Sequence, residues 1–397
     1  MLPTVSVLIV SFNVREYLLQ AIDSVKNSNY NGSIEIIVVD NDSFDGTPLS
    51  VQKKYPDIHV LKNNRNQGFG TGINQAAQKA KGEFLFILNP DTIVQENTIE
   101  KLRLYLKNNP QVGIVGPKVL NSDGSLQLAS KRSMPTVSVS LPKILGLSTL
   151  FPKSKWAGKY NLTYLEENKI HKVDAVSGSA LMIRKSSFDK LNGFDETFFM
   201  YGEDLDLCKR IIQLGKEIHY VPTTQIIHYG GESVRSAKFD SINAFFDSMS
   251  LFYKKHFSAT TTFFLSILIK LGIWLKKSIA FLKEWKSQII SILLDSILVS
   301  LSYLTIYYIK FFQNESFIFG GWIFLTGCCA IWLFTGYMYH LYGKNILSYH
   351  HACYAGVTGL LITLALNSLI HPLENFRFVL VIGSLTAMVL MPGWRLV

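Results

Sequence analysis

The pattern of hydrophobic and polar residues divides the chain near residue 255. Before this point, short apolar runs alternate with segments in which apolar residues recur every three or four positions. The runs are typical of buried strands and the segments of amphipathic helices, so an α/β domain built from β-α-β units is expected. Beyond this point long apolar segments dominate, and they predict an all-α region associated with a membrane.

Strands are predicted where apolar runs end in polar turn residues, at 5–10, 34–39, 58–61, 84–88, 112–115 and 173–183. The helical spacing after the first strand is clear, with Leu18, Ala21, Ile22 and Val25 on one face. Asn13 precedes this helix and is predicted to cap its N-terminus. The alternation of strands and helices predicts parallel pairing of the strands.

The strand predicted at 84–88 is followed at once by Asn89, Pro90 and Asp91. All five of its residues are apolar, which is typical of a strand buried on both faces, and Pro90 cannot continue a sheet ladder. Asp91 is therefore expected at the carboxyl end of a central strand, where open α/β sheets bind ligands. A carboxylate there suits a divalent cation with a diphosphate, but an Asp in a plain turn gives the same pattern.

A second carboxylate, that of Asp40, follows the strand predicted at 34–39 and is expected to face the same crevice as Asp91. Glycines at positions 68, 70 and 72 open the next helix, where backbone N–H groups can approach an anion. Their spacing is not that of a dinucleotide-binding fingerprint, and glycines at such a place are more often turn residues. Both interpretations of the glycines stay open at this point.

The composition favours a membrane surface over nucleic acid as a partner. The chain has 397 residues, a net charge of +10 and 48% hydrophobic residues, and it lacks a nucleic-acid-binding signature. Its four cysteines have neither metal-site nor disulfide spacing, which fits a reducing cytoplasm. The first apolar run has no basic residue before it, so no signal peptide is expected.

Six segments carry a family resemblance, in this order along the chain: VSVLIVSFN, IEIIVVDNDSFDGT, NRNQGFGTGIN, FLFILNPDT, FDETFFMYGEDLDLCKR and HYGGES. Together they resemble the motifs of family 2 glycosyltransferases of the GT-A fold. Within that family they look most like the rhamnosyltransferase-like branch of bacterial cell-surface polysaccharide synthesis. The resemblance covers roughly residues 4–255 and implies a catalytic domain with a Rossmann-like mixed sheet.

The resemblance also implies which residues bind the nucleotide-sugar donor. Asp40 matches the carboxylate that contacts the nucleotide base, and Asn66 and Gly68 belong to a donor-binding loop. Gly178 lies in a segment that the family places beside the donor sugar. The full set of predicted donor-binding residues is Asp40, Asp42, Asn66, Gly68, Asn89 and Gly178.

Metal binding is implied at Asp91 and His228. Asp91 matches the last acid of the DxD motif of the family, while Asn89 stands where the first Asp often occurs. An amide oxygen can coordinate a cation but adds no charge, so weakly held Mg²⁺ or Mn²⁺ is expected. His228 matches a position that often adds a metal contact; taken alone, it reads as an ordinary histidine at a strand end.

The segment Gly202-Glu203-Asp204-Leu205-Asp206 opens a predicted helix and implies the catalytic acids. Asp204 is the candidate base of an inverting displacement, with Glu203 as the second candidate. Acids in a first helical turn are also favoured by the helix dipole, whatever their chemistry. Asp206 stands four residues before Arg210 and is predicted to form a surface pair with it.

Residues 133–172 contain three prolines, many serines and scattered lysines among Leu, Phe and Trp. They are predicted to form a loop region on the acceptor side. This region either touches lipid or is a plain surface excursion, and the sequence favours neither alternative.

The C-terminal part contains five apolar segments. The first, 263–282, is interrupted by lysines and is expected to lie in the membrane interface, whereas 289–309, 317–339, 352–370 and 378–392 are expected to span. Four spans satisfy the positive-inside rule with a cytoplasmic catalytic domain. The predicted domains are therefore 1–255, a linker or interfacial helix at 256–286, and a transmembrane four-helix region at 287–397. This last region weakly resembles the membrane part of polyprenyl-phosphate sugar-phosphate transferases.

The resemblance and the apolar tail together predict a membrane-anchored enzyme of the bacterial inner membrane. It would move a sugar, most simply rhamnose, from a nucleotide-diphosphate donor to a polyprenyl-linked saccharide acceptor. The alternative is an inactive GT-A module that acts as a membrane scaffold in a polysaccharide assembly complex. The presence of Asp40, Asp91, Asp204 and His228 favours the enzyme.

Overall fold

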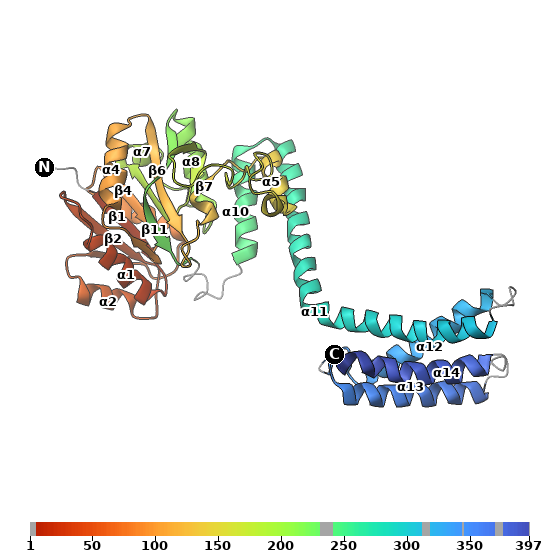
Figure 1. The fold of residues 1–397 in the computed structure, drawn as a ribbon. Helices are drawn as coiled ribbons and strands as arrows, with labels where there is room; N and C mark the ends of the chain where they lie inside the picture. The colour runs from red at the N-terminus through yellow and green to blue at the C-terminus, as the bar shows by residue number, and fades with distance from the viewer. Residues whose placement is uncertain (1–4, 231–240, 312–317, 344, 370–375, 397) are drawn as a thin grey trace. The chain divides into compact units, whose positions relative to one another are not determined.

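The computed structural model describes residues 5–230, 241–311, 318–343, 345–369 and 376–396. Some residues of the segments discussed above lie outside these ranges. They are 231–233 at the end of the HYGGES segment, Lys344, and positions 317 and 370 at the ends of two predicted spans. The chain forms two compact units, Met1–Ile273 and Trp274–Val397 (Figure 1). The division between them falls inside the segment 256–286.

The first unit contains a mixed sheet, as the resemblance implied. Its strands are β1 (Val5–Ser11), β2 (Ile34–Asp40), β3 (His59–Lys62), β4 (Phe84–Leu88), β5 (Thr92–Val94), β6 (Val112–Leu120), β8 (His171–Val173), β10 (Ala180–Arg184) and β11 (Glu217–His228). The order is β3-β2-β1-β4-β10-β6-β11-β5, with β8 paired to β11. Strand β10 runs antiparallel to both β4 and β6, so it interrupts an otherwise parallel centre.

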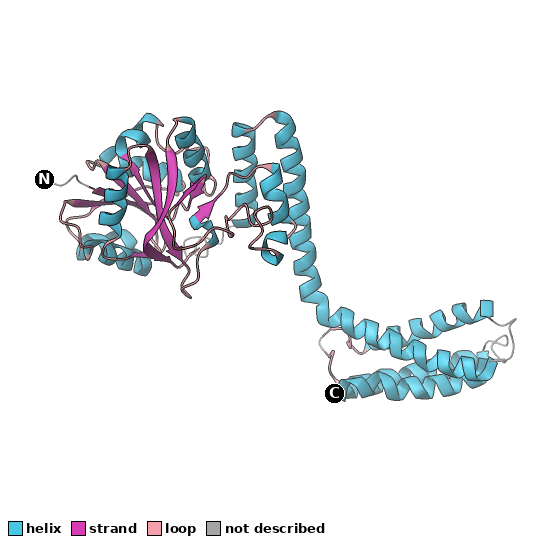
Figure 2. Cartoon of the chain, turned by 45° about the horizontal axis from the view of Figure 1, so that its top comes forward, coloured by secondary structure: helices cyan, strands magenta, loops and turns pink. Residues whose placement is uncertain are grey.

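Helices cover both faces of this sheet (Figure 2). They include α1 (Arg15–Lys26), α2 (Thr47–Lys54), α3 (Phe69–Lys79), α4 (Thr98–Asn108), α7 (Lys185–Lys190) and α8 (Glu203–Gln213). Phe84, Phe86 and Leu88 pack into one hydrophobic core with residues of α1 and α4. Leu85 and Ile87 pack into the other core with residues of α3 and α8. The all-apolar pattern of β4 thus reflects burial on both faces, as predicted.

The expected cap of α1 at Asn13 is wrong. The helix begins at Arg15 after Val14, and Asp45 Oδ2, from the loop after β2, accepts a hydrogen bond from Arg15 N at 2.9 Å. Asn13 adopts a positive φ of 53°, and its Oδ1 accepts a hydrogen bond from Phe44 N at 2.8 Å. The side chain therefore connects the loop after β1 to the loop after β2, which is a tertiary contact that local sequence preferences do not encode.

A group of helices lies beside the sheet in the first unit. It comprises α5 (Val137–Ile144), α6 (Leu147–Leu150), α10 (Ser241–His256) and the beginning of α11 (Ala259–Phe311). Figure 1 and Figure 2 show these elements side by side. Between β6 and α5 the chain forms β7 (Lys131–Arg132), which pairs with β9 (Ala175–Val176) in a separate two-stranded sheet.

The second unit is helical. It contains the rest of α11, then α12 (Ile318–Met338), α13 (Tyr349–Leu369), α14 (Arg377–Gly393) and a 3₁₀ turn, η4 (Trp394–Leu396). Within the described residues, two stretches are long and apolar enough to cross a membrane, Trp285–Phe311 and Arg377–Leu396. These helices suggest membrane association, and the four-span topology stays a prediction.

A buried ion pair connects the two apolar stretches of the second unit. Asp295 interrupts the apolar sequence of α11, and its carboxylate accepts two hydrogen bonds from the Arg395 guanidinium at 2.8 and 2.9 Å. Both side chains are fully buried, and Trp394 Nε1 donates to the same carboxylate at 2.8 Å. The charges therefore compensate each other inside an apolar unit, where an isolated charge is costly.

Replacing Arg395 with Ala should strongly destabilise the second unit, because Asp295 would remain buried without its counter-ion. The expected loss is about 3–5 kcal/mol of unfolding free energy, seen as a lower melting temperature of the full chain in detergent. The double variant Asp295→Leu with Arg395→Met is the control and should recover most of the loss. An unchanged melting temperature for Arg395→Ala alone would contradict the burial of the pair.

Candidate active site

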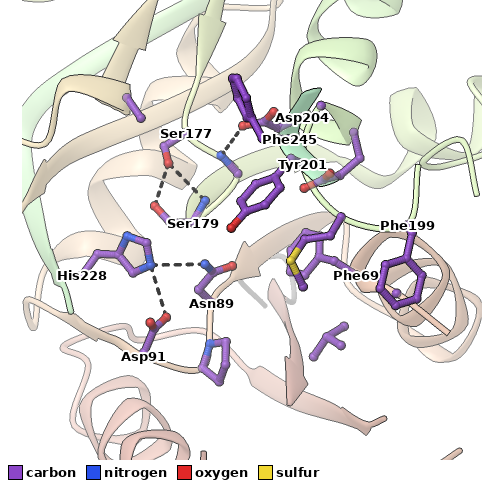
Figure 3. A pocket seen from close by; sticks show the side chains of 18 of the residues that line it. Phe69, Asn89, Asp91, Ser177, Ser179, Phe199, Tyr201, Asp204, His228 and Phe245 are labelled. Carbon is purple, nitrogen blue, oxygen red and sulfur yellow. Dashed lines mark hydrogen bonds and ion pairs between the residues drawn. The ribbon is translucent and has the colours of Figure 1, made fainter. Parts of the chain in front are cut away.

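A cavity of about 600 Å³ lies at the carboxyl ends of β1 and β4. Its wall also includes the loop before α3, the start of α8 and the end of β11 (Figure 3). Eight of the ten predicted site residues line it: Asn66, Gly68, Asn89, Asp91, Gly178, Glu203, Asp204 and His228. The fold thus brings together residues that stand up to 162 positions apart in the chain, from Asn66 to His228.

The other two predicted residues, Asp40 and Asp42, are outside the cavity wall, although their neighbour Asn41 is part of it. Asp42 is exposed. Asp40 is buried at the end of β2, and its Oδ2 accepts from Ser43 N at 3.0 Å. Its Oδ1 has no hydrogen-bond partner, and neither does the hydroxyl of Ser11, its β1 neighbour in the sheet register. Buried polar atoms without partners are rare and suit a polar ligand.

The donor-binding loop expected at Asn66 and Gly68 is held in place by backbone contacts. Asn66 Oδ1 accepts from Gly68 N at 3.0 Å, and Asn41 Nδ2 donates to Gly68 O at 3.0 Å. Gly68 has a φ of 88°, and a Cβ atom there would lie 2.4 Å from Phe199 O, so only glycine fits. Phe69 N also donates a hydrogen bond to Phe199 O, so the N–H group of Phe69 is not available to bind an anion.

Asn89, Asp91 and His228 meet on one side of the cavity (Figure 3). Strand β11 ends at His228, which stands opposite Thr92 in the antiparallel pairing with β5. His228 Nε2 lies 3.2 Å from Asp91 Oδ1 and 3.2 Å from Asn89 Nδ2. The sheet register, not sequence proximity, therefore brings the imidazole to the strand-end carboxylate.

Gln127 fixes the orientation of the His228 ring, since its Oε1 lies 3.0 Å from His228 Nδ1. With Nδ1 as the donor in this contact, the lone pair of Nε2 faces the Asp91 oxygen. Two acceptors at this distance suit a shared cation, and an outer hydrogen bond on the second ring nitrogen is typical of metal-ligating histidines. Within the described residues, no group of three or more His, Cys, Asp or Glu side chains is placed to hold a metal. The donor set thus fits a cation that also takes ligands from a substrate diphosphate.

Asp204 lies across the cavity, in the first turn of α8 (Figure 3). Its Oδ2 accepts from Arg132 Nη2 at 2.5 Å and from Gly178 N at 3.0 Å. Arg132 also donates to Val176 O at 2.7 Å, and its guanidinium is largely buried. The hydrogen bonds from Arg132 and Gly178 hold the Asp204 carboxyl group in one orientation.

Glu203 lies next to Asp204 but in a different environment. Only 8% of its surface is exposed, and its Oε2 has no hydrogen-bond partner. Burial, reinforced by the negative charge of Asp204, raises the pKa of Glu203 to about 8. At neutral pH, Glu203 therefore carries its proton.

The predicted pair of Asp206 and Arg210 is present at 2.7 Å, but its predicted place on the surface is wrong. Asp206 is fully buried, and it also accepts from His256 Nε2 at 2.7 Å and pairs with Lys255 at 2.7 Å. Helix α10 supplies these partners. The packing of α10 on α8 converts an exposed helical pair into a buried network.

Sequence reasoning missed Arg132 and Gln127, which orient Asp204 and His228. Arg132 belongs to a two-residue strand and stands 72 positions before its partner. Gln127 stands 101 positions before His228. Neither lies in a motif or a periodic segment, so the sequence held no local signal for either residue.

Residues 6–191 match the family described as Glycosyl transferase family 2, and residues 167–231 match a model described as N-terminal domain of galactosyltransferase. N-acetylglucosaminyl-diphospho-decaprenol L-rhamnosyltransferase of Mycobacterium tuberculosis is 29% identical over 211 residues, which are 50% of this chain and 68% of the relative. Rhamnosyltransferase WbbL of Escherichia coli K12 is 31% identical over 178 residues, 43% of this chain and 63% of that protein.

Among solved structures, the mannosyltransferase PcManGT of Pyrobaculum calidifontis, in complex with GDP-Man and Mn²⁺, is 16% identical with a TM-score of 0.45. That match covers 70% of this chain and 75% of the other. TarS of S. aureus in complex with UDP-GlcNAc is 19% identical with a TM-score of 0.43, and the match covers 63% of this chain and 65% of that chain.

The mixed sheet, with acids at the ends of its strands and a second acidic cluster at a helix N-terminus, is the arrangement that the resemblance to GT-A glycosyltransferases implied. The match over residues 6–191 identifies this part of the chain as a glycosyltransferase of family 2, and relatives in sequence include rhamnosyltransferases.

The raised pKa of Glu203 predicts a pH-dependent effect of Glu203→Gln on stability. The folded chain keeps this proton up to about pH 8, whereas an unfolded chain releases it near the ordinary pKa of 4.5. Wild-type stability should therefore fall as pH rises between these values, and that of Glu203→Gln should not. The difference in melting temperature should grow in favour of the variant from pH 5 to pH 8 and then level off.

Asp57→Asn is the control. Ion pairing with Lys26 lowers the pKa of Asp57, so this group is ionised in both the folded and the unfolded chain throughout the same pH range. Its effect on the melting temperature should therefore stay constant from pH 5 to pH 8. Equal slopes for the two variants would show that Glu203 is ionised in the folded protein.

Proposed function

We propose that this family 2 enzyme transfers a sugar, most simply rhamnose, from a nucleotide-diphosphate donor to a polyprenyl-linked saccharide. The names of two relatives support rhamnose as the transferred sugar. They are N-acetylglucosaminyl-diphospho-decaprenol L-rhamnosyltransferase and rhamnosyltransferase WbbL. The first name also supports the lipid-linked acceptor. Bacterial cell-surface polysaccharide synthesis is the process that such an acceptor serves.

The observation that carries the proposal is the arrangement of two sets of polar groups around one cavity. Asp91 and His228 lie on one side, and Asp204 lies on the other (Figure 3). An inverting displacement needs the acceptor hydroxyl and the leaving diphosphate on opposite faces of the sugar ring. The cavity offers a group for each role, with space between them for a sugar.

Asp204 is assigned as the base that takes the proton of the acceptor hydroxyl. Arg132 Nη2 and Gly178 N donate to its Oδ2, and Leu205 N donates to its Oδ1 at 2.7 Å, which leaves a lone pair of Oδ1 for a further hydrogen bond. Glu203 carries its own proton near neutral pH and is assigned as a hydrogen-bond donor toward substrate. The division of roles follows from burial, which raises the pKa of one acid, and from the cation that pairs with the other.

The donor diphosphate is assigned to the side of Asp91 and His228. These two residues, with Asn89, would hold Mg²⁺ or Mn²⁺, which when bound neutralises charge on the departing diphosphate. The unpartnered Oδ1 of Asp40 and hydroxyl of Ser11 suit the polar edge of a nucleobase. Asn66 and Gly68 shape the loop between these two places.

The enzyme is proposed to act at the bacterial inner membrane with its catalytic domain in the cytoplasm. The apolar stretches Trp285–Phe311 and Arg377–Leu396 support an anchor, and the distribution of basic residues supports four spans with both termini inside. An anchor of this kind keeps the cavity near a polyprenyl-linked acceptor.

The function is tested by assaying transfer from a panel of nucleotide sugars to a polyprenyl-linked acceptor. Transfer from dTDP-rhamnose or a related donor would support the proposal. Absence of transfer and of donor hydrolysis across the panel would favour the inactive scaffold instead. A product with the same anomeric configuration as the donor would exclude the inverting mechanism.

Asp204→Asn should lower the transfer rate on the order of a hundred- to ten-thousand-fold, because general-base assistance typically contributes that much. Donor binding should stay near normal, since the variant keeps the shape of the side chain. Glu203→Gln is the matched control and should retain much more activity, because Gln resembles the protonated acid. If Glu203→Gln is the slower variant, Glu203 is the base and the assignment is wrong.

Asp91→Ala should weaken the binding of Mn²⁺ in the presence of a nucleoside diphosphate, because it removes the charged ligand of the proposed site. Binding can be followed by the loss of the free Mn²⁺ signal in electron paramagnetic resonance. Asp123→Ala is the control, since Asp123 lies in an exposed turn and should leave Mn²⁺ binding unchanged. Equal Mn²⁺ affinity in wild type and Asp91→Ala would remove the metal from the proposal.

A further inference from the structure

An acid-free segment of the first unit, residues 124–165, contains six basic residues and no Asp or Glu. Two of the six are buried: Lys131 donates a hydrogen bond to Leu162 O, and Arg132 donates to Asp204. The other four side chains are exposed: Lys143, Lys153, Lys155 and Lys159. The segment therefore presents a concentrated positive charge to its surroundings.

Large apolar side chains are exposed on the same segment. Leu145 is 46% exposed, Leu150 70%, Phe151 59% and Trp156 54%. Together with Lys153, Lys155 and Lys159 they define what we call the 145–159 surface. Exposed aromatic and aliphatic side chains interleaved with lysines are unfavourable in water but are typical of segments that lie in a lipid interface.

The 145–159 surface is presented by a folded loop. Gly158 N donates to Ser154 O at 2.8 Å, and Thr163 Oγ1 donates to Pro152 O at 2.5 Å. Gly158 is required here, because a Cβ atom would lie 2.6 Å from Pro152 O. Asn161 is buried and donates to Leu128 O at 2.8 Å, which ties the loop to the start of the segment. These contacts fix the loop while its large apolar side chains point outward.

The loop adjoins a helix with the same character. A Cβ atom on Gly272 of α11 would lie 3.0 Å from Ile144 at the end of α5, so the two helices are in close contact. Nearby in α11, Phe263, Phe264, Ile267 and Leu271 are exposed by 63, 54, 48 and 39%. The same helix continues into the apolar stretch Trp285–Phe311. The loop and the start of α11 thus both expose large apolar side chains, and α11 is the helix that contains a candidate membrane stretch.

We propose that the 145–159 surface inserts into the interface of an anionic lipid leaflet and forms a membrane contact separate from the transmembrane helices. The lysines match the negative potential of such a leaflet, and the apolar side chains match its acyl boundary. The segment also contributes Gln127, Ala129 and Arg132 to the cavity wall, so the contact holds the cavity close to the lipid. The inference rests on the proposed membrane location and adds a site of contact to it.

The contact can be tested with tryptophan quenching by brominated lipid. The full chain is placed in nanodiscs of phosphatidylcholine and phosphatidylglycerol, with and without brominated acyl chains. In the Trp156→Phe background, a tryptophan is introduced by Leu150→Trp. Leu49→Trp is the matched control, because Leu49 on α2 is 69% exposed, against 70% for Leu150, and lies outside the 145–159 surface.

Brominated lipid should remove most of the fluorescence that Leu150→Trp adds and little of that added by Leu49→Trp. Replacing Lys153, Lys155 and Lys159 with Gln should reduce the quenching of the tryptophan at position 150 in anionic nanodiscs, toward the level seen in phosphatidylcholine alone. Equal quenching at positions 150 and 49 would overturn the proposal. Quenching at position 150 that is independent of lipid charge and of the lysines would overturn the choice of an anionic leaflet.

Two further outcomes separate this inference from the proposed location. If the full chain does not integrate into nanodiscs and is released from membranes by alkaline carbonate, the membrane location itself is wrong. If it integrates but the tryptophan at position 150 is shielded from acrylamide and not quenched by brominated lipid, a protein covers the surface. In that case the lipid contact is wrong while the anchor stands.

Discussion

Burial of β4 on both faces is the constraint on which the first unit depends. Alternate side chains of this strand enter two separate hydrophobic cores, and β1 and β10 pair with its two edges. The strand must end where the chain reaches Pro90, which has no N–H for a ladder. Asp91 is therefore placed at the rim of the cavity by the same packing that stabilises the sheet. The packing of β4 therefore both forms the hydrophobic cores and positions a residue of the site.

The opposite rim depends on electrostatics more than on packing. Three acids stand in the first turn of α8, where the helix dipole favours negative charge. The helix dipole acts on all three acids alike, so the differences between them come from the groups that surround each one. Asp204 pairs with Arg132, Asp206 with Arg210, and Glu203 remains protonated at neutral pH. Three neighbouring carboxyl groups thereby acquire different partners: Asp204 is oriented at the cavity by Arg132, Asp206 belongs to a buried ion-pair network, and Glu203 has no cationic partner.

The second unit follows the same rule in an apolar setting. Asp295 would be costly in a hydrophobic helix, but Arg395 and Trp394 donate hydrogen bonds to its carboxylate, and Ser291 Oγ accepts a hydrogen bond from Arg395. A hydrogen-bonded group of Tyr303, Trp332 and Ser384 lies in the same core. Polar side chains in this unit are accepted where they connect helices and satisfy each other.

The sequence by itself determined the alternation of strands and helices, the double burial of β4 and the rim positions of Asp91 and Asp204. These features follow from local periodicity, turn chemistry and short motifs, which a single chain displays directly. Tertiary structure alone decided the insertion of antiparallel β10, the contacts of Arg132 and Gln127, the burial of Asp206 and the protonation of Glu203. Each of these depends on groups brought together from distant parts of the chain. Burial and charge act through space, and the linear sequence does not record which groups become neighbours.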